Sequence, residues 1–252
     1  MFDVVLDEKY RREEIGTSDG TQRKYYKDEF WYKTNSVGSE GEVEALVSGL
    51  LKFSDLKPRE FVCYESGIVN GMKGCRSKNF LKNNESFFTF NHIHKNLTGV
   101  PMHMKTNQMV TLKEQVEYVV DFIKDATNID IRDYLKKVFT LDFLILNEDR
   151  HFNNLGIIMD ENGRYRVAPI FDNGKSLFNG NFSVKKELAM EENVKRVICR
   201  PFGGTHKKLL DYFGCGFEMD YDNAFLWLQS MEQSLEVAVL KYQLDELKKR
   251  IS

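Results

Sequence analysis

The chain has 252 residues, of which 42% are hydrophobic and 13% aromatic, and this composition excludes a disordered protein and supplies a core without disulfides or metals. Lysine and arginine number 36 against 38 aspartates and glutamates, a formal net charge of −2, so no overall basic field indicates a nucleic-acid partner. The four cysteines lie far apart and form no C-x-x-C pair, which favours a reduced cytosolic compartment over a disulfide scaffold or a zinc site.

Two sequence signals concern the location of the protein. The N-terminal residues lack the roughly 7–15-residue apolar stretch that is typical of a signal peptide. No window approaches the ~18 apolar residues that a membrane-spanning helix needs. We therefore expect a cytoplasmic protein with no membrane partner, and a non-classical secretion route stays open as the alternative.

The first third of the chain is predicted to contain mostly short strands. Residues 2–6 form an apolar run, and residues 25–34 alternate aromatic and charged side chains as a half-buried strand or hairpin would. Residues 42–53 place their two valines and three leucines on one face of a helix. Further strands are expected over 61–69 and 86–90.

The remainder of the chain is predicted to be mostly helical. Thr111 and Glu114 form a capping box that opens one helix. A second helix over 131–146 is apolar nearly all round, which is typical of a central helix. A β-hairpin is expected over 155–171, and one or two amphipathic helices are expected over 223–251.

This layout predicts an α+β fold with two lobes. Residues 1–105 are expected to form a small β-rich lobe, and residues 106–252 a larger helical lobe, with the join near 95–110. The sequence contains neither an internal repeat nor a low-complexity tract.

The most informative stretch follows the central helix. It is Asn147-Glu-Asp-Arg-His-Phe-Asn-Asn154, and after the hairpin comes Ala168-Pro-Ile-Phe-Asp-Asn-Gly174. This order is expected to bring together the side chains of Asp149, Asn154 and Asp172. Phosphoryl transfer needs such a set, because one carboxylate orients or deprotonates the attacking hydroxyl while an asparagine and a second carboxylate hold Mg²⁺ against ATP phosphates. Aspartate and asparagine are also ordinary capping residues, so the D-x-x-x-x-N pattern alone is weak evidence. The hypothesis depends on the order of the segments along the chain.

These two segments resemble the HipA-like serine/threonine kinases. In those bacterial protein kinases the catalytic loop is roughly D-x-H-x-x-N, and the metal-binding aspartate follows an A-P-x-x-D segment. The resemblance implies a two-lobed protein-kinase-like fold, ATP and Mg²⁺ as cofactors, Asp149 as catalytic base, and Asn154 and Asp172 as Mg²⁺ ligands. His151 matches the loop histidine, which is expected to brace this loop at the nucleotide site.

The N-terminal third carries a second part of the resemblance. Residues 17–24, Thr-Ser-Asp-Gly-Thr-Gln-Arg-Lys, are similar to the family's Gly-Ala-Gln-x-Lys phosphate loop, with Thr21 where alanine is usual. The similarity implies phosphate contacts from Gly20, Thr21, Gln22 and Lys24, since backbone amides around a glycine cradle phosphate oxygens. Most glycine-containing loops are simple turns, which is the alternative here.

Lys33 ends the aromatic segment Phe30-Trp-Tyr-Lys33. A lysine in a strand normally points to solvent, and the sequence alone favours that orientation. The resemblance instead implies that Lys33 reaches the ATP phosphates and pairs with a carboxylate on the next helix. Glu44 is the expected partner. Glu42 is the second choice, because side chains two positions apart on a helix point in different directions.

The resemblance covers about residues 14–215 and is least specific in the C-terminal helices. Full-length HipA toxins carry an extra N-terminal subdomain ahead of the phosphate loop, where this chain has only a short segment. It therefore resembles the compact, CtkA-type members. The antitoxin partner inferred for full-length members is therefore not carried over to this chain. HipA also phosphorylates a serine in its own phosphate loop, and the aligned position here is Thr17, next to Ser18.

The leading hypothesis is an ATP- and Mg²⁺-dependent kinase that phosphorylates serine or threonine on an unidentified protein. A kinase for a small molecule or a lipid headgroup is the nearest alternative, because the same constellation serves both acceptors. A pseudokinase that binds a nucleotide or a partner is a third reading. Against it, the five expected polar positions are all filled: Lys33, Glu44, Asp149, Asn154 and Asp172.

Two other patterns are given structural interpretations. Basic side chains recur at Lys73, Arg76, Lys78 and Lys82. Few aromatic residues accompany them, so a solvated face is expected rather than a nucleic-acid site. Three histidines fall at His92, His94 and His103. Without a neighbouring cysteine or carboxylate, they are expected on a loop surface rather than at a metal.

Overall fold

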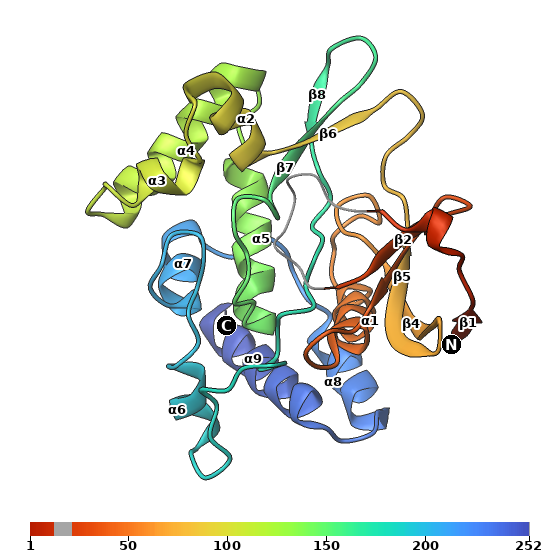
Figure 1. Cartoon of the computed structure of the whole chain (residues 1–252). Coiled ribbons are helices and arrows are strands. Elements are labelled where there is room, and N and C mark those ends of the chain that lie inside the picture. The colour runs from red at the N-terminus through yellow and green to blue at the C-terminus, as the bar shows by residue number, and fades with distance from the viewer. Residues whose placement is uncertain (13–21, 252) are drawn as a thin grey trace.

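The computed structural model describes residues 1–12 and 22–251, which form an N-terminal β-sheet and a mostly helical C-terminal part (Figure 1). This arrangement confirms the α+β prediction. Four residues named above lie outside the described residues: Thr17, Ser18, Gly20 and Thr21.

The N-terminal sheet has, over the described residues, the strand order β1-β4-β5-β3-β2. The strands are β1 Phe2–Val4, β2 Lys24–Lys27, β3 Phe30–Thr34, β4 Tyr64–Val69 and β5 Met72–Lys78. β1 is parallel to β4, and the other neighbouring pairs are antiparallel. A 3₁₀ turn, Glu8–Tyr10, follows β1.

Of the two alternatives expected over 25–34, a half-buried strand or a hairpin, the structure has the hairpin, formed by β2 and β3. Asp28 and Glu29 connect the two strands, and both have positive φ, 50° and 64°. Two consecutive positive φ angles give the turn whose twist matches that of the flanking strands. The register pairs Lys24 with Lys33, so these two side chains lie on the same face of the sheet.

Strand β5 lies between β3 and β4 and was not predicted. Its charged residues hide the apolar pattern of a strand. Lys73 and Lys78 have side chains 74% and 72% exposed, as a solvated face requires. Between them, Cys75 and Ser77 are buried. They are two positions apart and therefore share the sheet face of Lys33, which pairs with Cys75 in the register.

Helix α1, Glu40–Leu51, packs against β4 and β5. Its buried apolar residues include Val43, Val47 and Leu50, the face that the periodicity predicts. The helix begins and ends two residues earlier than expected.

A second sheet joins segments that are far apart in the sequence. Its order is β6-β7-β8, with β6 Ser86–Thr89, β7 Gly156–Met159 and β8 Tyr165–Val167. β7 and β8 confirm the second predicted hairpin, with shorter strands than expected. Because β6 pairs with β7, this sheet draws on both predicted lobes, and the boundary at 105/106 stays a prediction.

The helices that follow β6 are α2 Phe90–Thr98, α3 Met102–Thr106, α4 Leu112–Thr127, α5 Arg132–Ile145, α6 Met190–Val194, α7 His206–Phe213, α8 Tyr221–Ser230 and α9 Leu235–Ile251. The predicted capping box between Thr111 and Glu114 is present at the start of α4. In α5 every residue from Val138 to Ile145 is buried, so this helix is central as predicted. Figure 1 shows α7 and α9 beside α5, and both helices contact it.

The expectation that His92, His94 and His103 lie on a loop is wrong, because His92 and His94 belong to α2 and His103 belongs to α3. His94 is only 1% exposed. Its Nδ1 lies 2.7 Å from the carbonyl oxygen of Val100, and its Nε2 lies 2.7 Å from the hydroxyl of Tyr118. Nδ1 thus contacts the connection between α2 and α3, and Nε2 joins α2 to α4.

Two apolar clusters stabilise the regions on either side of the N-terminal sheet. The larger one joins α1 to the helices around α5. The smaller one contains Leu6, Tyr25, Tyr32 and Val69, and it covers the sheet face opposite Lys33. Within the described part of the chain, no helix has the length and apolar character needed to cross a membrane.

Candidate active site

The side chain of Lys33 lies between the sheet and the helical part of the chain. Its neighbour in β3, Tyr32, packs into the small apolar cluster, so strand alternation directs Lys33 to the other face. That side chain is 12% exposed, and its Nζ lies 2.8 Å from Asp172 Oδ1 and 3.5 Å from Glu44 Oε1. The solvent-facing alternative for Lys33 is therefore wrong.

Glu44, rather than Glu42, pairs with Lys33. Glu44 is 2% exposed, and its second oxygen, Oε2, accepts a hydrogen bond of 3.0 Å from the amide of Asn173. Glu42 faces away, where it accepts from Asn35 and pairs with Lys73. Glu44 thus contacts both Lys33 and the segment that carries Asp172.

Burial and the three neighbouring charges shift the pKa values of this cluster. Burial raises the pKa of Glu44 to about 7, although Lys33 opposes the change. Burial also acts to raise the pKa of Asp172, but the charges of Lys33 and then Lys24 outweigh it, so that pKa lies well below its usual range. Burial acts to lower the pKa of Lys33, but the charge of Asp172, together with those of Tyr64 and Glu44, outweighs it, so that pKa is raised. One ammonium group thus stands between two carboxylates of unlike acidity.

The backbone of Asp172 is left-handed, with φ 60°, a conformation that is unfavourable for a residue other than glycine. Hydrogen bonds hold both polar groups of the peptide that joins Phe171 to Asp172. The amide of Asp172 lies 3.4 Å from the Tyr64 hydroxyl, and the carbonyl of Phe171 accepts a 2.6 Å bond from Arg150 Nη1. The surroundings therefore impose this conformation and direct the carboxylate toward Lys33.

Arg150 joins the 147–154 loop to the segment of Asp172, and sequence reasoning did not find it. Its side chain is 0% exposed and makes a bidentate pair with Asp142 of α5. Nη2 also donates to Asn173 Oδ1 at 2.6 Å. The available signal was an aspartate within the otherwise apolar stretch 138–146, since a buried carboxylate requires a partner.

Hydrogen bonds within the loop order Asp149, His151 and Asn154. The carbonyl of Asp149 accepts from the His151 amide at 2.8 Å and from Asn154 Nδ2 at 2.9 Å. The amide of Asp149 donates to Asn147 Oδ1 at 2.9 Å. The carboxylate of Asp149 is 41% exposed and lies 3.6 Å from Arg200 Nη1 and 3.9 Å from His151 Nε2. Asp149 is thus fixed by its backbone while its carboxylate stays accessible.

The oxygens of Asn154 and Asp172 suit a hard divalent cation. Asn154 is 2% exposed and uses its Nδ2 within the loop, which leaves Oδ1 without a hydrogen-bond donor among the described residues. Asp172 uses Oδ1 for Lys33, and its low pKa keeps the carboxylate ionised. Carboxylate and amide oxygens are the ligands that Mg²⁺ takes in proteins.

The described part of the expected phosphate loop is short. Lys24 begins β2, is 8% exposed and contributes to the low pKa of Asp172. Gln22 is half-buried two residues earlier. Lys24, one of the residues expected to contact phosphate, therefore lies close to the Lys33 cluster.

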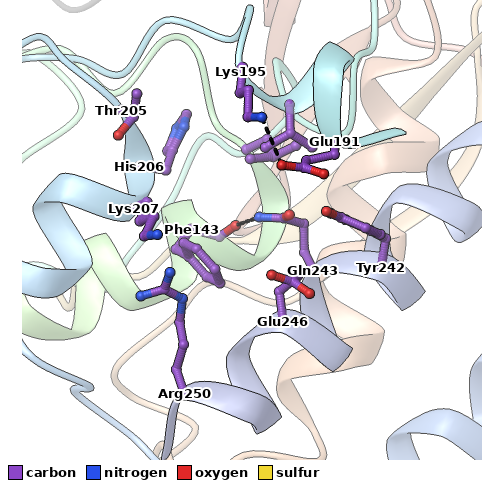
Figure 2. A pocket seen from close by; sticks show the side chains of 12 residues that line it. Phe143, Glu191, Lys195, Thr205, His206, Lys207, Tyr242, Gln243, Glu246 and Arg250 are labelled. Atoms are coloured by element: carbon purple, nitrogen blue, oxygen red, sulfur yellow. Dashed lines mark hydrogen bonds and ion pairs between the residues drawn. The ribbon is translucent and has the colours of Figure 1, made fainter. Parts of the chain in front are cut away.

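A cavity of about 360 Å³ is lined by α5, α6, α7 and α9 (Figure 2). On α9, Gln243 donates through Nε2 to the carbonyl of Phe143 at 2.6 Å. On α7, His206 Nε2 lies 2.8 Å from the carbonyl of Asn147, the residue that caps Asp149. Burial lowers the pKa of His206, so the neutral ring donates this bond from Nε2. The 147–154 loop is thus supported from the cavity side.

The fold and the Lys33–Glu44 pair define the class of this structure, a kinase-like fold. No protein-family model matches the chain, and no curated protein matches it. Among solved structures, the crystal structure of the Helicobacter pylori proinflammatory kinase CtkA matches with a TM-score of 0.65. The match covers 95% of this chain and 91% of that chain at 16% sequence identity.

At this identity the match establishes a shared fold. The protein has a CtkA-like kinase fold, as expected from the resemblance to the compact, CtkA-type kinases. Membership of the HipA-like family stays a prediction, as do the roles of the individual site residues.

Proposed function

We propose that the protein is an ATP- and Mg²⁺-dependent kinase that phosphorylates serine or threonine on a protein. The observation that carries this proposal is the Lys33 ammonium, 2.8 Å from Asp172 and 3.5 Å from Glu44. In kinases such a lysine positions the triphosphate, and the helix carboxylate holds the lysine. The protein acceptor is supported by the resemblance of residues 147–154 to serine/threonine kinases and by the fold shared with CtkA.

Each site residue has a separate task in the proposed reaction. Lys33 and Lys24, with the loop that contains Gly20, Thr21 and Gln22, bind the ATP phosphates. Asn154 and Asp172 would hold Mg²⁺, which neutralises the negative charge that develops on the phosphates. His151 orders the loop through its backbone bonds to Asp149 and Asn154.

The transfer itself requires a base near the acceptor. The carboxylate of Asp149 takes the proton of the serine or threonine hydroxyl, the hydroxyl oxygen forms a bond to the γ-phosphorus, and the bond from that phosphorus to the bridging oxygen breaks to release ADP. Residues 1–105 would then form the nucleotide lobe and residues 106–252 the lobe that binds the acceptor.

Incubation with labelled ATP, Mg²⁺ and a cell lysate tests the function. We expect phosphoserine or phosphothreonine on protein, and none with Asp149→Asn. Label confined to small hydroxylated compounds or lipids would replace the protein acceptor with a small-molecule one. ATP binding without any Asp149-dependent turnover would identify a pseudokinase and contradict the proposal.

The same experiment addresses self-phosphorylation. We propose Thr17 or Ser18 as the acceptor in the enzyme's own chain. Intact-mass measurement after incubation with Mg-ATP would show one added phosphate, absent in the Thr17→Ala/Ser18→Ala double variant. An unchanged mass, with lysate proteins phosphorylated, would contradict this part.

A further inference from the structure

A second cavity, of about 400 Å³, is not used by the proposed mechanism. Three segments border it. They are residues 58–63 between α1 and β4, residues 78–82 at the end of β5, and residues 166–169 from β8 onward. We call it the basic groove.

The charge lining the basic groove is of one sign. Arg59, Lys78, Lys82 and Arg166 line it, and the described lining contains no acidic side chain. Arg166 is paired with Glu85 outside the lining at 2.8 Å, whereas Arg59 and Lys82 make no ion pair with any described residue. The chain as a whole has a net charge of −2, so this positive charge is local and complementary to an anionic partner.

The floor of the basic groove is apolar. Phe61, Val62 and Pro169 are buried there. Phe80 is half-buried, and its ring packs on Phe87 and Phe171 at centroid distances of 5.5 and 5.8 Å. The groove therefore combines an apolar base with cations that come from separate segments of the chain.

This combination selects among anionic ligands. A small anion such as phosphate would pair with cations and leave the apolar floor uncovered. Single-stranded nucleic acid binds through exposed aromatic rings that stack on bases, and here the Phe61 ring is buried and the Phe80 ring is packed against other rings. A peptide with an apolar side chain between carboxylates satisfies both the floor and the cations.

We propose that the basic groove binds an acidic peptide segment of the protein substrate, with one apolar side chain on the Phe61 floor and flanking carboxylates at Arg59 and Lys82. The assignment to the substrate rests on the proposed kinase function. Phe80 also contacts Phe171, which directly precedes Asp172, so the groove adjoins the segment of the active site. Docking there would hold a substrate near the site and lower its KM without changing kcat.

Cys63 provides a probe of occupancy. Its thiol is exposed in the groove, whereas Cys75 and Cys199 are buried and Cys215 is partly buried. The probe ligand is a fluorescein-labelled peptide with one leucine flanked by glutamates, and its control carries glutamines instead. We expect the acidic peptide to bind at least about tenfold more tightly in fluorescence anisotropy at low salt, and to slow alkylation of Cys63 by N-ethylmaleimide.

Variants separate charge from shape. Arg59→Glu/Lys82→Glu should weaken peptide binding at least about tenfold, while Lys113→Glu, an exposed charge reversal on α4, should leave it unchanged. Cys63→Trp, which fills the groove and keeps its charge, should also weaken binding. With an acceptor that carries the acidic segment, the double variant should raise KM about fivefold or more and leave kcat and the KM for ATP unchanged.

Three results would overturn the inference: equal binding of the glutamine peptide, unchanged binding in the double variant, or equal protection of Cys63 by inorganic phosphate or single-stranded RNA. Anisotropy needs no ATP, so the two proposals fail separately. Asp149-dependent turnover without peptide binding overturns only the docking inference. Peptide binding with no turnover supports the groove as a peptide site and contradicts the kinase function.

Discussion

Two buried ion-pair clusters contact residues 171–173, and they differ in how many hydrogen bonds and ion pairs their groups make. Around Arg150, the guanidinium bonds to Asp142, to the carbonyl of Phe171 and to Asn173, and both charged side chains are at most 1% exposed. Around Lys33, one ammonium group forms ion pairs with two carboxylates, those of Glu44 and Asp172, and the Asp172 side chain is 22% exposed. The second cluster thus keeps the Asp172 carboxylate partly accessible, with Lys24 close to it.

This difference separates structural support from chemistry. A fully bonded buried pair fixes its segments, and removal of one partner leaves an uncompensated charge. A cluster with a partly exposed carboxylate can accept a further cation or adjust its protonation, which is typical of functional sites. We therefore expect changes near Arg150 to affect stability first, and changes near Asp172 to affect activity first.

The largest effect is expected from Asp172→Asn. The substitution removes the ionised oxygen proposed to hold Mg²⁺ and keeps the shape of the side chain. Phosphotransfer should fall by about 10³-fold or more, with the thermal midpoint of unfolding changed little, as measured by labelled-ATP turnover and circular dichroism. Asp160→Asn in the β7–β8 turn is the matched control, and wild-type activity in Asp172→Asn would contradict the assignment.

Arg150→Met tests the structural role of the Arg150 cluster. It leaves Asp142 buried without its partner, so the free energy of unfolding should fall by about 3–5 kcal/mol. Urea titration would measure this change. Arg164→Met, an exposed arginine that is paired with Asp160, should change stability by less than about 1 kcal/mol. Similar effects of the two variants would refute the structural role of the Arg150 cluster.

Glu44→Gln tests the protonation of the Lys33 cluster. Because burial raises the pKa of Glu44 to about 7, the folded state holds this proton more tightly than the unfolded chain. The stability contributed by Glu44 is therefore full below pH ~4.5 and declines as pH rises through about 7. Between pH 5 and 7.5 the thermal midpoint of the wild type should fall by at least about 3 °C relative to Glu44→Gln. Glu42→Gln should keep the wild-type profile; a similar change in both variants would argue against the Glu44 pKa.

The smallest effect is expected from His206→Phe, on the cavity side of the catalytic loop. The substitution removes the bond to the Asn147 carbonyl and keeps a buried ring, at a loss of about 1 kcal/mol. We expect a several-fold decrease in kcat with the KM for ATP unchanged, because Asn147 caps Asp149. His103→Phe serves as the control, and equal kcat in His206→Phe and wild type would show that this support is dispensable.

Local sequence signals were sufficient for much of the helical part. The capping box at Thr111 and the apolar run of α5 each depend on residues close in the chain, and both are confirmed. The hairpin β2–β3 follows from its alternating side chains in the same way. β5 was missed because its exposed lysines obscure a strand that is defined by its neighbours, and α2 was missed because its histidines resemble a polar loop.

The candidate site shows where local signals end. The sequence by itself determined which polar residues are available, and a kinase-like order of Lys33, Glu44, Asp149, Asn154 and Asp172 along the chain. Only the tertiary structure decided that Lys33 is buried rather than solvated, since that depends on which face of β3 the apolar cluster covers. It also decided the partner of each charge, since Lys33 and Asp172 are 139 positions apart. Burying a charge costs free energy, and only a partner that the packed fold brings close offsets this cost.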